Sequence, residues 1–174
     1  KLKKTQIVKK LRMIKKNSTK VREECGVFGI SNINDASALA ALGLHALQHR
    51  GQEGCGIVSY DGKNYYSEKR FGLVGDNFNN EDTIKKLPGN YAIGHNRYST
   101  TGGKILRNVQ PFFADTNAGG IGVSHNGNFT NAITLRKELV KDGAIFYTTS
   151  DSETIVQLIA RSKKEKNIDK IIEA

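Results

Sequence analysis

Short apolar runs separated by polar turns dominate the chain from residue 25 onward, and runs of this kind predict β-strands. The predicted strands are residues 25–30, 55–60, 64–68, 91–95 and 120–125. Asp61-Gly62 lies between the second and third of these runs and is typical of a β-hairpin turn. The pattern therefore predicts several strands, two of them joined as a hairpin.

A long early helix is predicted over residues 36–49, which are apolar on almost every side. A helix without a polar face must be covered on both sides, so we expect it to lie between a sheet and another element. The chain has no long alternation of strands and helices, which argues against a doubly wound parallel sheet. The pattern favours an α+β fold in which helices cover sheets.

Two further helices are predicted near the C-terminal end. Residues 131–141 form an amphipathic segment that is closed by Gly143, and residues 151–161 form another. Ser150 and Glu153 have the spacing of a capping box, which predicts the start of the second helix.

The net charge of +10 lies almost entirely at the N-terminal end of the 174 residues. Residues 1–24 hold ten Lys or Arg and two Glu, whereas residues 25–174 hold 17 basic and 15 acidic residues. A nearly neutral body gives no reason to expect nucleic-acid binding. The basic leader could lie on an anionic surface as an amphipathic helix or act as a transit peptide, and we favour a removable extension.

Several classes of protein are excluded by what the sequence lacks. No apolar run has the length of a membrane-spanning helix. Cys25 and Cys55 are too few for a disulfide framework, and no His or Cys pair has the spacing of metal ligands. We therefore expect a cytoplasmic domain without a metal or a membrane partner of its own.

Polar residues gather where predicted strands end, and such loops are where a rigid scaffold presents catalytic groups. The clusters are residues 48–51, 94–102, 124–128 and 150–153. Each has an ordinary structural explanation when it is taken alone. Asn126-Gly127 could be a type I′ turn, and Asp151 could be an acidic first-turn residue of a helix. Their joint occurrence in this order favours a functional site.

Six ordered segments resemble the class II glutamine amidotransferases, the glutaminase domains of the N-terminal-nucleophile hydrolase superfamily. The segments are CGVFGI (25–30), LQHRGQEG (47–54), GHNRYSTTGG (94–103), NVQPFF (108–113), SHNGNFTN (124–131) and TSDSE (149–153). The amino-acid sequences of these segments are most similar to those of the branch that supplies ammonia to phosphoribosyl diphosphate. That reaction gives 5-phosphoribosylamine in the first step of purine synthesis. The resemblance implies a four-layer αββα sandwich with two mainly antiparallel sheets.

The resemblance also implies which residues carry the chemistry. Cys25 corresponds to a nucleophile whose own α-amino group, with a pKa near roughly 8, exchanges the proton. Asn126 and the backbone N–H of Gly127 correspond to the oxyanion hole. Since this chemistry needs no imidazole, His95 and His125 are expected to be structural.

The remaining implied site residues bind glutamine. Arg97 corresponds to the residue that binds the α-carboxylate, a task that suits a planar, two-pronged donor. Asp151 corresponds to the acceptor for the α-ammonium group. Arg50 and Gly51 border the nucleophile in relatives and receive supporting roles, and Thr100 belongs to the glutamine loop. Cys55, between two glycines of a strand, is expected to be a small core residue.

Residues 1–24 conflict with the resemblance, in which the nucleophile is the first residue of the mature chain. While these residues are attached, the Cys25 nitrogen is part of a peptide bond and cannot act as a base. Residues 1–24 are therefore expected to be a propeptide that ends at Glu24, with residues 25–174 as the glutaminase domain. Two alternatives stay open: the glutaminase of another amidotransferase, and a non-catalytic nucleic-acid or membrane-surface binder driven by the leader.

The chain begins without Met and stops inside a helical pattern at residues 171–174, so we expect a longer protein. Phosphoribosyltransferase sites resemble one another in an acidic pair that follows an apolar strand and leads into a Thr/Gly-rich phosphate loop, and this chain has none. Phosphoribosyl diphosphate, Mg²⁺ and any iron–sulfur cluster are therefore expected to bind beyond residue 174. The full-length enzyme is expected to be a homo-oligomer.

Overall fold

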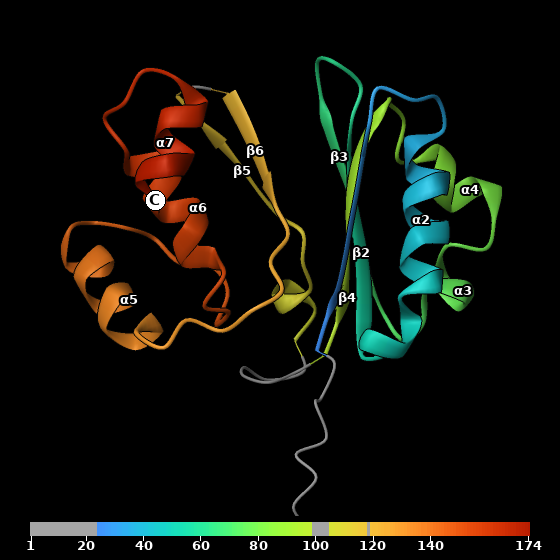
Figure 1. Cartoon of the computed structure of the whole chain (residues 1–174), viewed down its shortest axis with the longest axis horizontal. Helices are drawn as coiled ribbons and strands as arrows, with labels where there is room; N and C mark the ends of the chain where they lie inside the picture. Colours follow the sequence, from blue (N-terminus) through green and yellow to red (C-terminus); the bar gives the residue numbers. More distant parts are fainter. Residues whose placement is uncertain (1–23, 99–104, 118) are drawn as a thin grey trace, which may run out of the picture.

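The computed structural model describes residues 24–98, 105–117 and 119–174 (Figure 1). Within these residues two antiparallel β-sheets face one another, and helices cover the outer side of each (Figure 1). The predicted α+β arrangement of antiparallel sheets between helical layers is confirmed. No helix in these ranges is long and apolar enough to cross a membrane.

The larger sheet has four strands in the order β1-β4-β2-β3, and every neighbouring pair is antiparallel. The strands are β1 (Gly26–Ser31), β2 (Gly54–Tyr60), β3 (Tyr65–Phe71) and β4 (Tyr91–Arg97). β2 and β3 form the predicted hairpin. Asp61 Oδ1 accepts hydrogen bonds from the backbone N–H of Lys63 and Asn64, and Gly62 supplies a φ of 97°.

Helix α2 (Ala36–Ala46) covers the outer face of this sheet (Figure 1). Small residues let the two approach closely, since a Cβ on Gly94 would lie 2.6 Å from Leu44 Cδ1. On its other side α2 contacts α3 (Val74–Asn77), and Ile84 of α4 (Glu81–Lys85) packs against the same core. The predicted two-sided packing is confirmed only for part of the helix, because Leu42 is 65% exposed.

The early helix is shorter than predicted. It ends at Ala46, and a separate 3-10 turn, η1 (Gln48–Arg50), leads into Gly51. The Gln48 side chain closes this turn by donating to the Gly51 carbonyl at 2.6 Å. The turn redirects the chain toward the end of the larger sheet.

The smaller sheet pairs β5 (Phe112–Thr116) with β6 (Gly119–Val123). Helices α6 (Glu153–Arg161), α5 (Ala132–Lys141) and α7 (Asn167–Glu173) lie on its outer side (Figure 1). Sequence patterning missed β5 together with the short helices α3 and α4. It also carried the last strand to residue 125, whereas β6 ends at Val123.

Helix α6 begins two residues later than predicted, and the predicted capping box is wrong. The Glu153 carboxylate accepts from the backbone N–H of Tyr147 and Thr148, at 2.8 and 2.7 Å, instead of reaching Ser150. The bend before the helix brings residues 147 and 148 closer to that carboxylate than the cap position. Residues 150–152 are thereby placed outside the helix.

Candidate active site

Three of the predicted site segments meet at one end of the larger sheet. Cys25 directly precedes β1, and Arg97 is the last residue of β4. The antiparallel register pairs Gly26 with Asn96 and Gly54 with Arg97. The turn η1, which enters β2, therefore lies at the same sheet end as Cys25 and Arg97.

Cys25 is half-buried and has a left-handed backbone, with a φ of 47°. Its Sγ lies 3.5 Å from both the backbone N and the carbonyl O of Tyr98. Burial raises the pKa of the Cys25 thiol, while the Tyr98 backbone contact and the Arg97 charge act in the opposite direction. The thiol is mainly protonated at neutral pH, so nucleophilic attack requires a base.

Arg50 and Gly51 hold the backbone around Cys25. The Arg50 Nε donates to the Cys25 carbonyl at 2.7 Å, and a second guanidinium nitrogen donates to the Glu24 carbonyl at 3.3 Å. Gly51 is buried, and a Cβ there would lie 2.7 Å from the Arg97 carbonyl carbon. Only a residue without a side chain fits where this loop crosses the end of β4.

Arg97 is buried and connects the two sheets. Its guanidinium donates to the Asn108 carbonyl at 2.7 Å, and its Nε lies 3.8 Å from Glu53 Oε2. The Asn108 amide in turn donates to Thr149 Oγ1 and accepts from Thr149 N, at 2.8 and 3.0 Å. Arg97 is therefore linked to the segment that leads into Asp151.

Asn126 and Gly127 follow β6 and are exposed. Neither has a positive φ, so the type I′ turn that could explain this dipeptide is absent. Gly127 instead lies close to the His125 ring, since a Cβ there would lie 2.5 Å from His125 Nε2. The segment is tied to the larger sheet by Ser124, whose hydroxyl donates to the Gly94 carbonyl at 3.2 Å.

Asp151 lies just before α6 and is half-buried. Its Oδ2 accepts from the Phe129 backbone N at 2.9 Å, and its Oδ1 accepts from the Ser152 hydroxyl at 3.2 Å. The carboxylate therefore holds the far end of the segment that carries Asn126 and Gly127.

Seven of the eight predicted site residues lie in the described ranges, and Thr100 lies outside them. Their catalytic and binding roles stay predictions. Sequence reasoning assigned no role to Asn108, Gln110 or Ser152, which are buried and join the parts of the site. The signal for the first two was a pair of polar residues inside an otherwise apolar motif.

Cys55 and His95 lie inside the protein. Cys55 is fully buried in the core under α2, and burial raises the pKa of its thiol to about 12. The expectation of a small core residue is confirmed. Both ring nitrogens of His95 are without a hydrogen-bond partner in the described ranges, and burial lowers its pKa to about 4. Those ranges also contain no group of three His, Cys, Asp or Glu side chains that could hold a metal ion.

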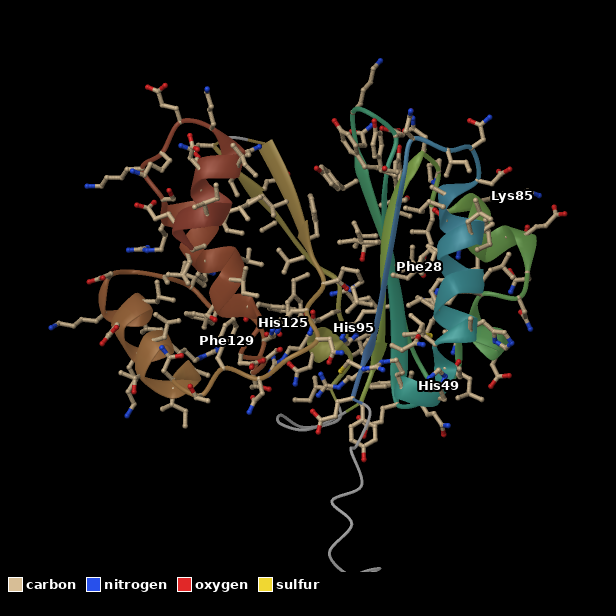
Figure 2. The ribbon with its side chains drawn as sticks, viewed as in Figure 1. Phe28, His49, Lys85, His95, His125 and Phe129 are labelled. Carbon is tan, nitrogen blue, oxygen red and sulfur yellow. The ribbon has the colours of Figure 1, made fainter. Side chains whose placement is uncertain are left out.

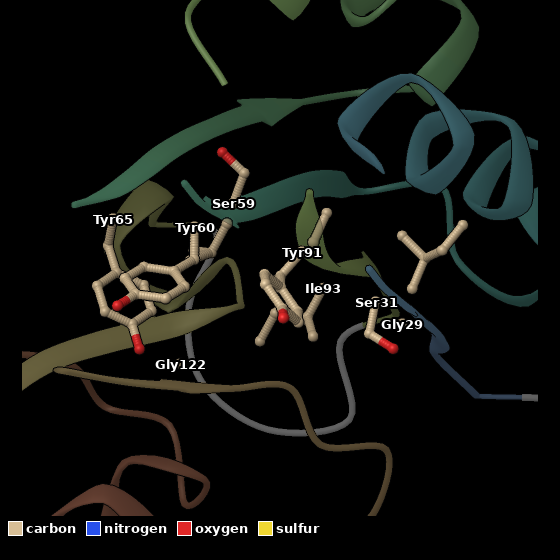
Figure 3. A pocket seen from close by; sticks show the side chains of 11 residues that line it. Gly29, Ser31, Ser59, Tyr60, Tyr65, Tyr91, Ile93 and Gly122 are labelled. Carbon is tan, nitrogen blue, oxygen red and sulfur yellow. The ribbon is translucent and has the colours of Figure 1, made fainter. Parts of the chain in front are cut away.

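A cavity of about 460 Å³ opens at the other end of the larger sheet (Figure 3). Tyr60, Tyr65 and Tyr91 line it, and the rings of Tyr60 and Tyr65 are stacked with 4.4 Å between centroids. None of the seven site residues in the described ranges lines this cavity. Its position separates it from the polar cluster around Cys25.

Comparison with known proteins places this geometry in a family. A family model of the glutamine amidotransferase domain matches residues 95–172. The amidophosphoribosyltransferase of Rhizobium etli is 57% identical over 154 residues, which make up 88% of this chain and 31% of the relative. A chloroplastic amidophosphoribosyltransferase of Vigna aconitifolia is 50% identical, over 89% of this chain and 32% of its own length.

A solved structure agrees with the sequence matches. Glutamine phosphoribosylpyrophosphate amidotransferase from B. subtilis, complexed with ADP and GMP, superimposes with a TM-score of 0.75 and 42% identity. The match covers 83% of this chain and 31% of that protein. The chain thus spans about a third of the length of the relatives that it matches.

The fold, the motif order and the family model indicate the class: the chain matches the glutamine amidotransferase domain over residues 95–172 and has the fold of the N-terminal-nucleophile hydrolases. Within that class its sequence and structure match the glutaminase part of the amidophosphoribosyltransferases.

Proposed function

We propose that this chain is a glutaminase domain that uses Cys25 as its nucleophile and releases ammonia from glutamine. One observation carries the proposal. The Cys25 thiol contacts Tyr98, the residue after Arg97, and Arg97 is joined through Asn108 to the segment of Asp151. A thiol, a guanidinium and a carboxylate at one site fit an amide substrate that is also a free amino acid.

The reaction needs a proton acceptor because burial keeps the Cys25 thiol protonated. In the proposed reaction the α-amino group of Cys25 takes the thiol proton while sulfur adds to the side-chain amide carbon. That proton then passes to the leaving nitrogen, which departs as ammonia and leaves a thioester. Water hydrolyses the thioester and releases glutamate together with the regenerated thiol.

The negative charge that develops on the amide oxygen must be stabilised by hydrogen-bond donors. The Asn126 side-chain amide and the Gly127 N–H are assigned to this task, and loss of one such donor typically lowers kcat by about 100- to 1,000-fold. Arg97 is assigned to the substrate α-carboxylate and Asp151 to its α-ammonium group. Both ends of the amino acid are then recognised, which excludes glutamine within a peptide.

Activation requires cleavage of the peptide bond between Glu24 and Cys25, since an amide nitrogen cannot serve as the base. Arg50 supports this assignment by bonding the carbonyl groups on both sides of that bond, at 3.3 and 2.7 Å. After cleavage, its contact with the Cys25 carbonyl still fixes the nucleophile. Residues 1–24 are on this proposal a propeptide.

The ammonia acceptor is proposed to be phosphoribosyl diphosphate, by analogy with the amidophosphoribosyltransferases that the chain matches. The acceptor site, with Mg²⁺ and any iron–sulfur cluster, is assigned to the part of the relatives that this chain does not span. A homo-oligomer and a cytoplasmic location are proposed likewise, although some matched relatives are chloroplastic.

Mass spectrometry of the N-terminus, combined with an ammonia-release assay, tests the proposal. Chains that begin at Cys25 are expected to convert glutamine to glutamate and ammonia, and chains that retain Glu24 are expected to be inactive. Full activity with the leader attached contradicts the mechanism. In calorimetry the chain is expected to show no saturable binding of phosphoribosyl diphosphate with Mg²⁺, and micromolar binding contradicts the assignment of the acceptor site.

A further inference from the structure

The ring of His125 lies against Gly127 in the segment that follows β6, and Figure 2 labels this ring beside Phe129. It stacks on the Phe129 ring, with 5.1 Å between centroids and 16° between planes. Its Nε2 edge lies so close to Gly127 that a Cβ there would approach it to 2.5 Å. The ring therefore lies directly beside Gly127, whose N–H is assigned to the oxyanion hole.

Three hydrogen bonds hold His125 in place. The Gln110 amide accepts from the His125 backbone N at 2.7 Å and donates to its carbonyl at 3.3 Å. The ring Nδ1 lies 2.9 Å from the Ser152 hydroxyl. Gln110 fixes the backbone of His125, and Ser152 fixes the orientation of its ring.

Ser152 is 1% exposed, and its hydroxyl has two further partners. It donates to Asp151 Oδ1 at 3.2 Å and accepts from the Gln110 amide at 3.2 Å. A hydroxyl has one proton, and an ionised carboxylate can only accept. With that proton donated to Asp151, the His125 ring must donate from Nδ1, and this selects one tautomer of the imidazole.

The buried Ser152 hydroxyl thus contacts both the His125 ring, which lies beside Gly127, and the Asp151 carboxylate, which is assigned to the substrate ammonium group. We propose that Ser152 and His125 are positioning residues for the glutaminase reaction. Ser152 orients the His125 ring, and the ring holds the Gly127 N–H in its catalytic position. The inference rests on the proposed function, because it assigns a purpose to the geometry of that same site.

The expected signature is a loss of kcat with little change in KM. Ser152→Ala removes one hydrogen bond to Asp151, but the Asp151 carboxylate keeps the bond from Phe129 N and Arg97 keeps its contacts, so most of the glutamine-binding contacts remain. A misplaced oxyanion donor slows only the chemical step, and a displacement of about 1 Å lowers the rate about 100-fold. We expect kcat to fall about 10- to 100-fold and KM to change less than about three-fold.

The test uses the complete protein with its N-terminus at Cys25. Ser37→Ala is the matched control, because Ser37 is 2% exposed and also loses one buried hydroxyl, but it lies on α2 and donates to the Leu87 carbonyl. The rate of Cys25 alkylation by iodoacetamide gives a readout that is independent of the oxyanion donors. It is expected to be equal in the wild type, Ser152→Ala and Ser37→Ala.

A second variant keeps the test decisive if Ser152→Ala does not fold. In His125→Asn the amide nitrogen can occupy the place of Nδ1 and donate to Ser152, but no ring edge remains beside Gly127. We expect a similar loss of kcat while alkylation of Cys25 proceeds as in the wild type.

The outcomes separate the two proposals. A wild-type protein with a free Cys25 that releases no ammonia overturns the proposed function and this inference with it. An active wild type with unchanged kcat in Ser152→Ala or His125→Asn overturns this inference alone. Equal losses in Ser152→Ala and Ser37→Ala, or a rise in KM without a loss of kcat, also overturn it.

Discussion

The two faces of the larger sheet differ in chemistry although they share the same strands. Toward α2, Ala92 and Gly94 of β4 pack against small and aliphatic side chains, and Asn96 donates to the Leu44 carbonyl at 2.6 Å. Toward the smaller sheet, β4 presents His95, which Figure 2 labels, and Arg97, which bonds the Asn108 carbonyl. Because side chains alternate along a strand, one strand serves a packed core and a polar site at once.

The core face provides most of the apolar burial, and the polar face provides a network whose members must all be satisfied. Changes on the first face are therefore expected to alter stability, and changes on the second to alter activity. The two cysteines lie on different faces: Cys55 is buried in the core under α2, and Cys25 lies at the polar end of the sheet.

The largest effect is expected for Cys25→Ser, which replaces the nucleophile by a much weaker one. Glutamine hydrolysis should fall by at least about a thousand-fold, with an unchanged melting temperature. Cys55→Ala should retain kcat and lose about 1 kcal/mol of stability. Ammonia release and thermal unfolding measure the two effects. Equal losses of activity in Cys25→Ser and Cys55→Ala would show that the two faces do not differ in their contribution to catalysis.

Leu44→Ala tests the core face. The side chain is fully buried between α2 and the sheet, so its truncation should leave a cavity and cost about 2–5 kcal/mol of unfolding free energy. Below the lowered melting temperature kcat should stay at the wild-type value. Denaturant titration gives the stability, and an equally large drop in kcat would show that the two faces are coupled.

His95 makes the polar face sensitive to acid. Its folded pKa of about 4 lies below the unfolded value of about 6.5, so between these pH values the unfolded state binds the proton and the folded state does not. Stability should therefore fall as the pH falls through this window, by roughly 3 kcal/mol in all.

Unfolding titrations at pH 7, 5.5 and 4.5 measure this loss. His95→Met should reduce it, whereas His45→Gln, a change at an exposed position of α2, should retain it. Parallel curves for the wild type and His95→Met would show that His95 does not resist protonation.

The smallest of the four effects is expected for Arg97→Lys, which retains the charge but cannot form a two-pronged contact with a carboxylate. KM for glutamine should rise about 10- to 30-fold, with a smaller change in kcat. Steady-state kinetics with glutamine checks this result. Lys69→Met, a change on the same face away from Cys25, should leave KM unchanged; a wild-type KM in Arg97→Lys would remove Arg97 from the substrate site.

Local pattern sufficed for most elements and for the site segments. Five apolar runs and three periodic segments predicted strands and helices that the structure contains, and the Asp61-Gly62 turn was placed correctly. β5 was missed because its residues, Phe-Phe-Ala-Asp-Thr, form neither a continuous apolar run nor an alternating pattern. The capping box at Ser150 and Glu153 was wrong because another local contact replaced it: Glu153 accepts from the backbone N–H of Tyr147 and Thr148 in the bend before the helix.

The amino-acid order already shows which reactive residues are available: a cysteine before the first strand, an arginine at the end of another strand, and a His-Asn-Gly segment, in an order similar to that of one enzyme family. Which of these residues share a site depends on how the two sheets pair and pack. Pairing of β1 with β4 brings Cys25 to Tyr98, 73 positions further along the chain, and the segment before α6 brings Ser152 to Gln110 and His125. The spacing of apolar and polar residues along the chain predicts local helices and strands. Hydrogen bonds between distant segments depend instead on how the sheets pack.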